Sequence, residues 1–157
     1  MQIPEPQQEH RWLQRIVGEW TFEHECMMGP GQPPTKSTGT ESVRRLGNVW
    51  VICEGQGEMP GGGVSNSIMS LGYDPARKRF VGTFIVSVMT YLWVYDGALE
   101  GNVLTMDCDG PSFTGQGMAK YQDIIEIISD DHRTLSSRAF VDGKWQHFMT
   151  AHYRRKK

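Results

Sequence analysis

The sequence predicts an all-β protein, an antiparallel up-and-down barrel of about ten strands with one N-terminal helix. Three observations carry this prediction. The composition is rich in glycine, with 18 residues, and poor in Ala and Leu, which favours strands and turns over helices. Apolar and polar residues alternate with period two along most of the chain. Turn signals recur at the spacing of about 8–12 residues that is typical of sandwiches and barrels.

The one predicted helix spans about residues 5–17. Pro4 and Pro6 stand at its entry, where a missing N–H costs little. Apolar residues with helical spacing form one stripe: Trp12, Leu13, Ile16 and Val17. Gly18 then supplies a C-terminal stop.

Strands are predicted over the remainder, about residues 20–155. The first covers 20–28 and is broken by the Gly- and Pro-rich segment 29–34. The other expected strands are 37–46, 48–58, 66–73, 78–87, 91–99, 103–107, 117–128, 135–141 and 145–155. Asp74-Pro75 begins a type I turn, and Asp142-Gly143 is a strong hairpin signal. Closing these hairpins into a barrel would remove exposed strand edges, so we expect one domain over residues 1–157.

Length and charge exclude several function classes. The 157 residues suit a single domain, and 16 Lys and Arg against 18 Asp and Glu give a net charge of −2. This near-neutral balance argues against nucleic acid as a partner. No apolar run approaches the roughly 20 residues of a membrane helix, so no membrane partner is expected. The three cysteines form no evident disulfide framework, and no secretory signal is visible, so we expect a cytoplasmic protein.

Motifs for nucleophilic catalysis and metal binding are missing from the sequence. It contains no Gly-x-Ser-x-Gly, Ser-x-x-Lys, His-Glu-x-x-His or Cys-x-x-Cys pattern. His24 and Cys26 share a strand face, and His147 on the last strand could approach His24 if the barrel closes. A hydrogen-bonded polar histidine is the alternative interpretation of each. We therefore expect no metal and no cofactor.

Aromatic residues on two strands give the strongest hint of a binding site. Tyr91, Trp93 and Tyr95 share one strand face, although a slip of one residue would turn Leu92 and Val94 inward instead. Trp145, His147 and Met149 are predicted to share a face of the last strand. With polar anchors from other strands, the expected ligand-binding residues are His24, Arg45, Tyr91, Trp93, Tyr95, Trp145, His147 and Met149.

Several segments carry a resemblance to a known family. They are Gly18-Glu19-Trp20, Leu71-Gly72-Tyr73-Asp74, Phe80-Val81-Gly82-Thr83, Leu92-Trp93-Val94-Tyr95-Asp96-Gly97 and Phe148-Met149-Thr150-Ala151-His152-Tyr153-Arg154-Arg155. In this order they resemble the bacterial domain of unknown function 1579 family, over about residues 7–155. The resemblance implies a lipocalin-like, calycin-type barrel with no established activity. It also suggests that Arg154 or Arg155 stacks on Trp20 to close the barrel. Related haem-binding barrels open with Gly-x-Trp-x-Gly-x-Gly, and the later glycines are absent here.

Three functions remain open at this point. The first is a non-enzymatic binder of a small hydrophobic ligand, oriented by His24, Arg45 and His147. The second is an enzyme that uses His24 with Glu41 or His147 in the same cavity. The third is a solid barrel that acts as a dimeric interaction module. Residues 124–128 are apolar on both strand faces, which predicts a covered outer surface and hence a homodimer.

Overall fold

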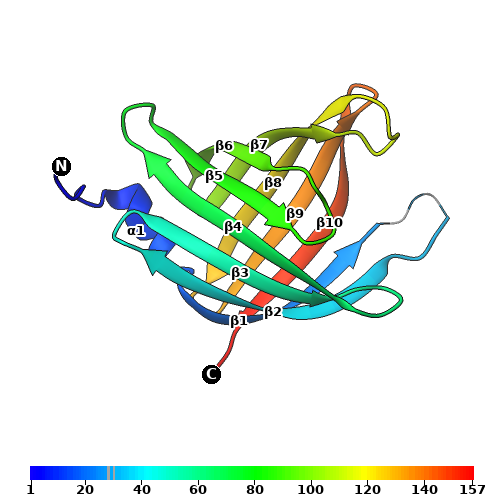
Figure 1. Cartoon of the computed structure of the whole chain (residues 1–157), viewed down its shortest axis with the longest axis horizontal. Helices are drawn as coiled ribbons and strands as arrows, with labels where there is room; N and C mark the ends of the chain where they lie inside the picture. The colour runs from blue at the N-terminus through cyan, green and yellow to red at the C-terminus, as the bar shows by residue number, and fades with distance from the viewer. Residues whose placement is uncertain (28, 30) are drawn as a thin grey trace.

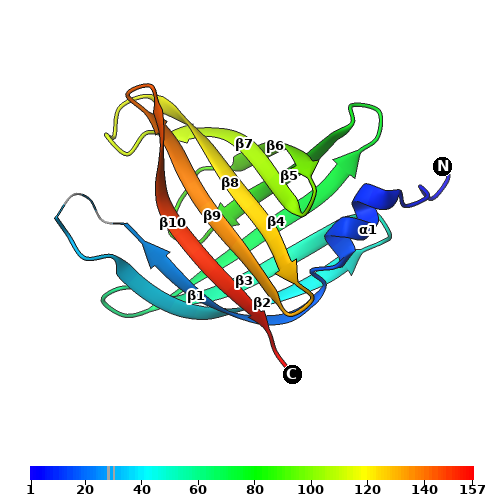
Figure 2. The same cartoon turned by 180° about the vertical axis from the view of Figure 1, so that it is seen from behind.

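The computed structural model describes residues 1–27, 29 and 31–157 and forms a closed antiparallel β-barrel behind one short helix (Figures 1 and 2). The helix α1 spans Gln8–Gln14. The strands are β1 (Gly18–Cys26), β2 (Thr35–Leu46), β3 (Trp50–Glu58), β4 (Val64–Asp74), β5 (Arg79–Val86), β6 (Trp93–Glu100), β7 (Val103–Pro111), β8 (Met118–Ser129), β9 (His132–Val141) and β10 (Lys144–Arg155).

Each strand pairs with its neighbours in sequence, and β1 pairs with β10 to close the barrel. This meander confirms the predicted all-β fold class, the ten strands and the N-terminal helix. Strand bounds agree with the predicted ranges to within a few residues. The exception is the predicted end of the first strand at Met28, which lies outside the described residues.

The helix is shorter than the predicted range 5–17. Glu5 precedes Pro6, and a residue in that position is disfavoured in the α region. Gln7 is extended, and its carbonyl oxygen accepts the first hydrogen bond of the helix. The Gln7 backbone N–H donates to His10 Nδ1 at 2.8 Å. At the other end the chain leaves the helix through a 3₁₀-type turn. Its hydrogen bonds run from Arg15 N to Trp12 O and from Ile16 N to Leu13 O, both 3.2 Å.

The helix closes one end of the barrel. Trp12, Leu13 and Ile16 are buried there. The Trp12 indole N–H and the Arg15 guanidinium both donate to Asn102 Oδ1 in the β6–β7 turn, at 3.2 and 3.0 Å. Figure 1 shows α1 at this end and the β3–β4 and β9–β10 hairpins at the other. The helix therefore covers the end of the barrel opposite these hairpins.

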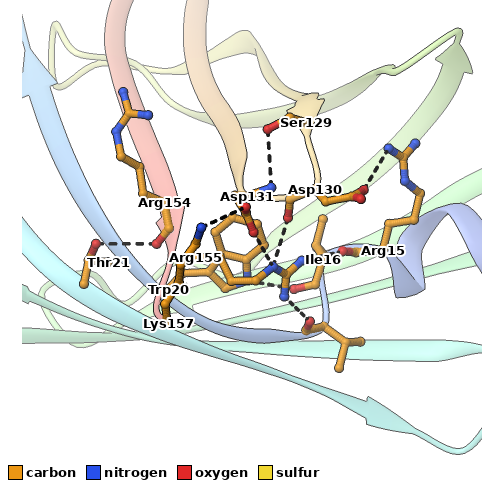
Figure 3. Close-up of polar contacts among 11 residues, drawn as sticks. Arg15, Ile16, Trp20, Thr21, Ser129, Asp130, Asp131, Arg154, Arg155 and Lys157 are labelled. Atoms are coloured by element: carbon orange, nitrogen blue, oxygen red, sulfur yellow. Dashed lines mark hydrogen bonds and ion pairs between the residues drawn. The ribbon is translucent and has the colours of Figure 1, made fainter.

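Arg155 and Trp20 lock the helix to the strands (Figure 3). The Arg155 guanidinium lies 4.3 Å from the centre of the Trp20 ring, which confirms the predicted stacking. It also donates to the carbonyl oxygens of Val17, Arg15 and Asp130 at 2.7, 2.9 and 2.9 Å. The Trp20 indole N–H donates to Ile16 O at 2.9 Å. Trp20 is thus a structural residue of the closed end.

No helix among the described residues is long and apolar enough to cross a membrane.

Candidate ligand cavity

A cavity of about 450 Å³ lies inside the barrel, between β1–β5 on one side and β8–β10 on the other. It exists because five inward positions on β2, β3 and β4 carry only a hydrogen atom or a small hydroxyl group. These are Ser37, Gly55, Gly57, Ser65 and Ser67. The volume falls in the range typical of small-molecule sites.

Apolar side chains make up most of the remaining wall. They are Ile16, Phe22, Met69, Phe84, Val86, Val88, Ile125, Leu135 and Met149. Ile16 places the inner end of the cavity against the turn that follows α1. Met59 and Pro60 of the β3–β4 hairpin lie at the outer end. The cavity therefore runs along the barrel from the helix toward the hairpins.

A buried ion pair occupies the inner end. Arg133 on β9 and Glu41 on β2 both line the cavity and are 5% and 8% exposed. The Arg133 Nη2 donates to Glu41 Oε1. The same guanidinium lies 4.5 Å from the Trp20 ring centre and 4.0 Å from that of Tyr153. Among the described residues, its Nη1 is buried without a hydrogen-bond partner.

Burial dominates the electrostatics of this inner end. It raises the pKa of Glu41 more than Arg133 lowers it. Burial and the Glu41 carboxylate also raise the pKa of the Cys53 thiol and of the Tyr153 hydroxyl. Both groups are therefore neutral at pH 7, and Arg133 and Glu41 form the ion pair of the inner end.

Polar groups also stand near the outer end. His24 and Ser37 are opposite each other on β1 and β2, with 3.5 Å between His24 Nδ1 and Ser37 Oγ. Burial lowers the pKa of His24, which favours the neutral imidazole. Burial likewise raises the pKa of Cys26 on the same strand face, so this thiol is poorly nucleophilic. In the described part of the chain, no three His, Cys, Asp or Glu side chains are grouped as a metal site would need.

Aromatic and other apolar side chains fill the other half of the interior, along β6–β8. The Trp93 ring packs edge-on against Tyr121, with 5.2 Å between ring centres, and lies over Gly110, where a Cβ would collide with it. Phe113 lies in the β7–β8 loop, is 69% exposed, and contacts both Tyr121 and Phe148, with ring centres 5.5 and 4.9 Å apart. This half contributes few residues to the cavity.

The same half of the barrel contains a buried carboxyl group, that of Asp123 on β8. Asp123 accepts hydrogen bonds of 2.5 Å from the Tyr95 hydroxyl and from Ser137 Oγ. Burial raises the pKa of Asp123 above its ordinary value despite both bonds. Tyr95 has a pKa well above normal, through burial and the adjacent carboxyl group. The three side chains satisfy one another and do not line the cavity.

The sequence-predicted binding residues divide into four groups. His24 and Met149 line the cavity. Trp93 and Tyr95 point inward, as the preferred register predicts, but they lie in the filled half. Tyr91 precedes β6, and its hydroxyl donates to Asp109 O at 3.0 Å.

The remaining three lie outside the cavity. Arg45 has the inward parity of β2 but stands at the strand's end, exposed, and donates to Asn48 Oδ1 at 2.7 Å. The prediction that Trp145 and His147 share a face with Met149 is wrong, because a β-bulge shifts the register between His147 and Met149. Trp145 pairs with Phe140 on the outer surface, and His147 Nε2 lies 2.6 Å from Thr150 Oγ1, also outside.

The sequence analysis missed Arg133. Its expected strand began at Leu135, whereas β9 begins at His132. Arg133 has the same parity as Leu135 and Ser137, so a longer strand would have placed one cation on an otherwise uncharged inward face. That pattern is the signal that could have found it.

The family model for the proteins described as "Protein of unknown function (DUF1579)" matches residues 5–155. The chain belongs to this family. Within the DUF1579 family the match covers the helix and all ten strands, as the resemblance implied. No curated protein matches the chain.

Solved structures show the same fold at low identity. The crystal structure of Rv2717c from M. tuberculosis is 14% identical, with a TM-score of 0.64 over 98% of this chain and 100% of that one. The S-type phycobiliprotein lyase CPES from Guillardia theta is 14% identical, with a TM-score of 0.64 over 97% and 99%. EF1p2_mFAP2b bound to DFHBI is 14% identical, with a TM-score of 0.52 over 94% and 98%. At this identity the likeness concerns the fold alone.

Proposed function

We propose that this DUF1579 protein is a non-enzymatic binder of a small, largely apolar molecule. The observation that carries the proposal is the cavity of about 450 Å³, with its apolar walls and a buried ion pair at its inner end. A concave, mostly apolar pocket with few polar groups is typical of small-molecule sites. Structural neighbours add support, since one barrel of this shape is bound to DFHBI and another is a phycobiliprotein lyase.

Binding is favoured over catalysis by the positions of the predicted acid–base residues. Glu41 is engaged by Arg133 at the inner end, whereas His24 lies toward the outer end beside Ser37. His147 lies on the outer surface next to Thr150. General acid–base catalysis needs the two groups within reach of one substrate atom, and these three side chains are dispersed instead.

Native mass spectrometry of protein purified without refolding tests the proposal first. We expect a co-purified small molecule, or saturable uptake of flat apolar compounds when none is carried along. Ser67→Phe places a ring in the cavity and should abolish uptake. Asn66→Phe adds the same ring to the outer face of β4 and should leave it unchanged. Equal uptake by the two variants would contradict binding in this cavity.

Location and assembly are also proposals. We propose a cytoplasmic protein, in keeping with three cysteines that are all free thiols, two of them buried. We further propose a homodimer through the outer surface of β8, where Ile128 is 51% exposed while Ile125 and Ile127 face the interior. Sedimentation equilibrium that gives the monomer mass at micromolar concentration would contradict the dimer.

A further inference from the structure

Two serine hydroxyls of β4 lie over two glycines of β3 in the wall of the cavity. Gly55 pairs with Ser67, and Gly57 pairs with Ser65. A Cβ at Gly55 would stand 2.7 Å from Ser67 Oγ, and a Cβ at Gly57 would stand 3.5 Å from Ser65 Oγ. Each hydroxyl therefore occupies the side of the sheet where a larger residue on β3 would have filled the space. All four residues line the cavity.

Alternation along β4 places both hydroxyls inside the barrel. Ser65 and Ser67 share their strand face with Met69, which is buried in the core. Val64 and Ile68 lie on the other face of the strand and are exposed. The two hydroxyls therefore face the cavity and not the outer surface.

Neither hydroxyl is engaged in a normal hydrogen bond. Ser67 Oγ has no partner among the described residues, and it remains accessible to a water-sized group, because the fully buried unpartnered side-chain atom in that part of the chain is a different one. Ser65 Oγ lies 3.5 Å from Gly57 O, beyond the roughly 2.5–3.0 Å of an ordinary O–H···O bond. By contrast, Ser70 Oγ lies 2.6 Å from Thr83 Oγ1. The two cavity serines are therefore available to a ligand.

The rest of the cavity favours uncharged groups on one edge of the ligand. The cation of the inner end is already paired with a carboxyl group. Burial lowers the pKa of His24, which keeps its imidazole neutral at pH 7. Across the cavity from the serines, β8–β10 contribute Ile125, Leu135 and Met149, whose apolar side chains leave a ligand oxygen without a good partner. Polar groups of a ligand are therefore best placed against β4.

We propose that the cavity selects a flat, largely apolar molecule with two uncharged hydroxyl groups on one edge, bound to Ser65 and Ser67. This inference rests on the proposed binding function and deepens it. Residues two apart on a strand are separated by about 7 Å, so the two ligand hydroxyls need a similar separation. A hydroxyl suits each serine, because it can either donate to or accept from the serine oxygen. The apolar edge of the ligand packs against Leu135 and Met149.

Two isomers test the proposal on the unmodified protein. In 2,7-dihydroxynaphthalene both hydroxyls lie on the same long edge of the ring, at a separation close to that of the serines. In 2,6-dihydroxynaphthalene they lie on opposite edges, so only one can reach β4. The isomers have the same atoms and nearly the same apolar area. We expect equilibrium dialysis at pH 7 to show the 2,7 isomer binding about fivefold tighter, the increment of one hydrogen bond. The hydrocarbon 2-methylnaphthalene should bind more weakly than the 2,7 isomer.

Alanine variants assign the preference to the serines. Ser67→Ala and Ser65→Ala each remove one hydroxyl without filling the cavity, so each should reduce the preference for the 2,7 isomer to less than about twofold. The preference is a ratio measured on one protein, and a general loss of stability does not change it. Asn66→Ala is the matched control, because Asn66 lies between the two serines on the outer face of β4 and should keep the full preference.

Each outcome decides a different point. If the unmodified protein binds the two isomers equally, or prefers the 2,6 isomer, the serine pair does not select the ligand and the inference fails while the binding function stands. If the preference persists in both alanine variants, another part of the cavity causes it and the inference also fails. If none of the three naphthalenes binds, the proposed function itself is contradicted. The ratio for the unmodified protein decides the first point even where a variant does not fold.

Discussion

The two halves of this barrel share one backbone geometry but have opposite interiors. Along β6–β8 the inward positions carry the rings of Trp93, Tyr95 and Tyr121 and apolar side chains such as Leu104 and Met106, and Trp93 even lies over a glycine. Along β2–β4 the inward positions carry Gly55, Gly57, Ser65 and Ser67, and the space is left open. Strand number alone therefore does not make a cavity. The sizes of the inward side chains on each strand determine where it lies.

The buried charged groups repeat this contrast. In the filled half Asp123 has two hydroxyl donors and does not line the cavity. In the open half Arg133 contacts a carboxylate and two aromatic faces, and its Nη1 has no hydrogen-bond partner among the described residues. The first arrangement is complete without a ligand. The second lies at the inner end of the cavity.

Removing the buried cation should give the largest effect. We expect Arg133→Met to lower the free energy of unfolding by about 3–5 kcal/mol, because Glu41 is left buried without a partner. Urea unfolding measures the change. The double variant Arg133→Met with Glu41→Leu should recover most of the loss, since both charges are then removed. A single variant as stable as the unmodified protein would show that the pair is not buried as described.

Shortening a side chain in the filled half should destabilise the fold without changing ligand affinity. Trp93→Ala should lower the free energy of unfolding by about 3 kcal/mol, because it leaves a void beside Tyr121. Ligand affinity should stay within about threefold of the original, as Trp93 does not line the cavity. Trp145→Ala on the outer surface is the control and should cost less than about 1 kcal/mol. Loss of ligand binding in Trp93→Ala would contradict the claim that only the open half binds the ligand.

Removing one donor to the buried carboxyl group should have a smaller effect. Tyr95→Phe should lower the free energy of unfolding by about 1–3 kcal/mol, because Asp123 then keeps only Ser137 as a donor. Thermal unfolding checks this value. Ser137→Ala should give a similar loss, and the double variant should show non-additivity because both residues contact one carboxyl group.

The pH dependence of stability should be the smallest signal. The folded-state pKa of Asp123 is raised above the unfolded value, so the folded protein holds this proton to higher pH than the unfolded chain does. Stability from this group is fully present below the unfolded pKa, near 3.8, and is lost as pH rises through the folded pKa. Asp123→Asn should therefore flatten the fall of stability with rising pH in that window. An unchanged slope in urea titrations at several pH values would contradict the raised pKa.

The sequence was sufficient to predict the strands and their order. Alternation and turn signals such as Asp142-Gly143 are local, and each strand pairs with its neighbour, so local patterns predict the whole meander. The stacking of an arginine on Trp20 was also predicted, but from the family resemblance and not from local patterns. These features depend on short stretches of chain or on recurring motifs.

The site could be predicted only in part, because it depends on non-local packing. Nothing near His147 in the sequence announces the bulge that turns Trp145 and His147 outward. The partnership of Arg133 with Glu41 joins strands 92 residues apart. The aromatic residues around Trp93 suggested the wall of a binding site. In the structure those rings pack on one another, and the cavity lies beside the small residues on the opposite strands. Large side chains are conspicuous in a sequence, but a cavity is made by small ones.

Methionine methyl NMR tests the central claim most directly, because methionines lie in both halves. Met69 and Met149 line the cavity, whereas Met106 is buried on β7 in the filled half. With the methionine ε-methyl groups labelled by carbon-13, titration with 2,7-dihydroxynaphthalene should shift the Met69 and Met149 signals saturably and leave Met106 unmoved. Shifts centred on Met106, or no shift at all under saturating ligand, would contradict a binding cavity in the open half of the barrel.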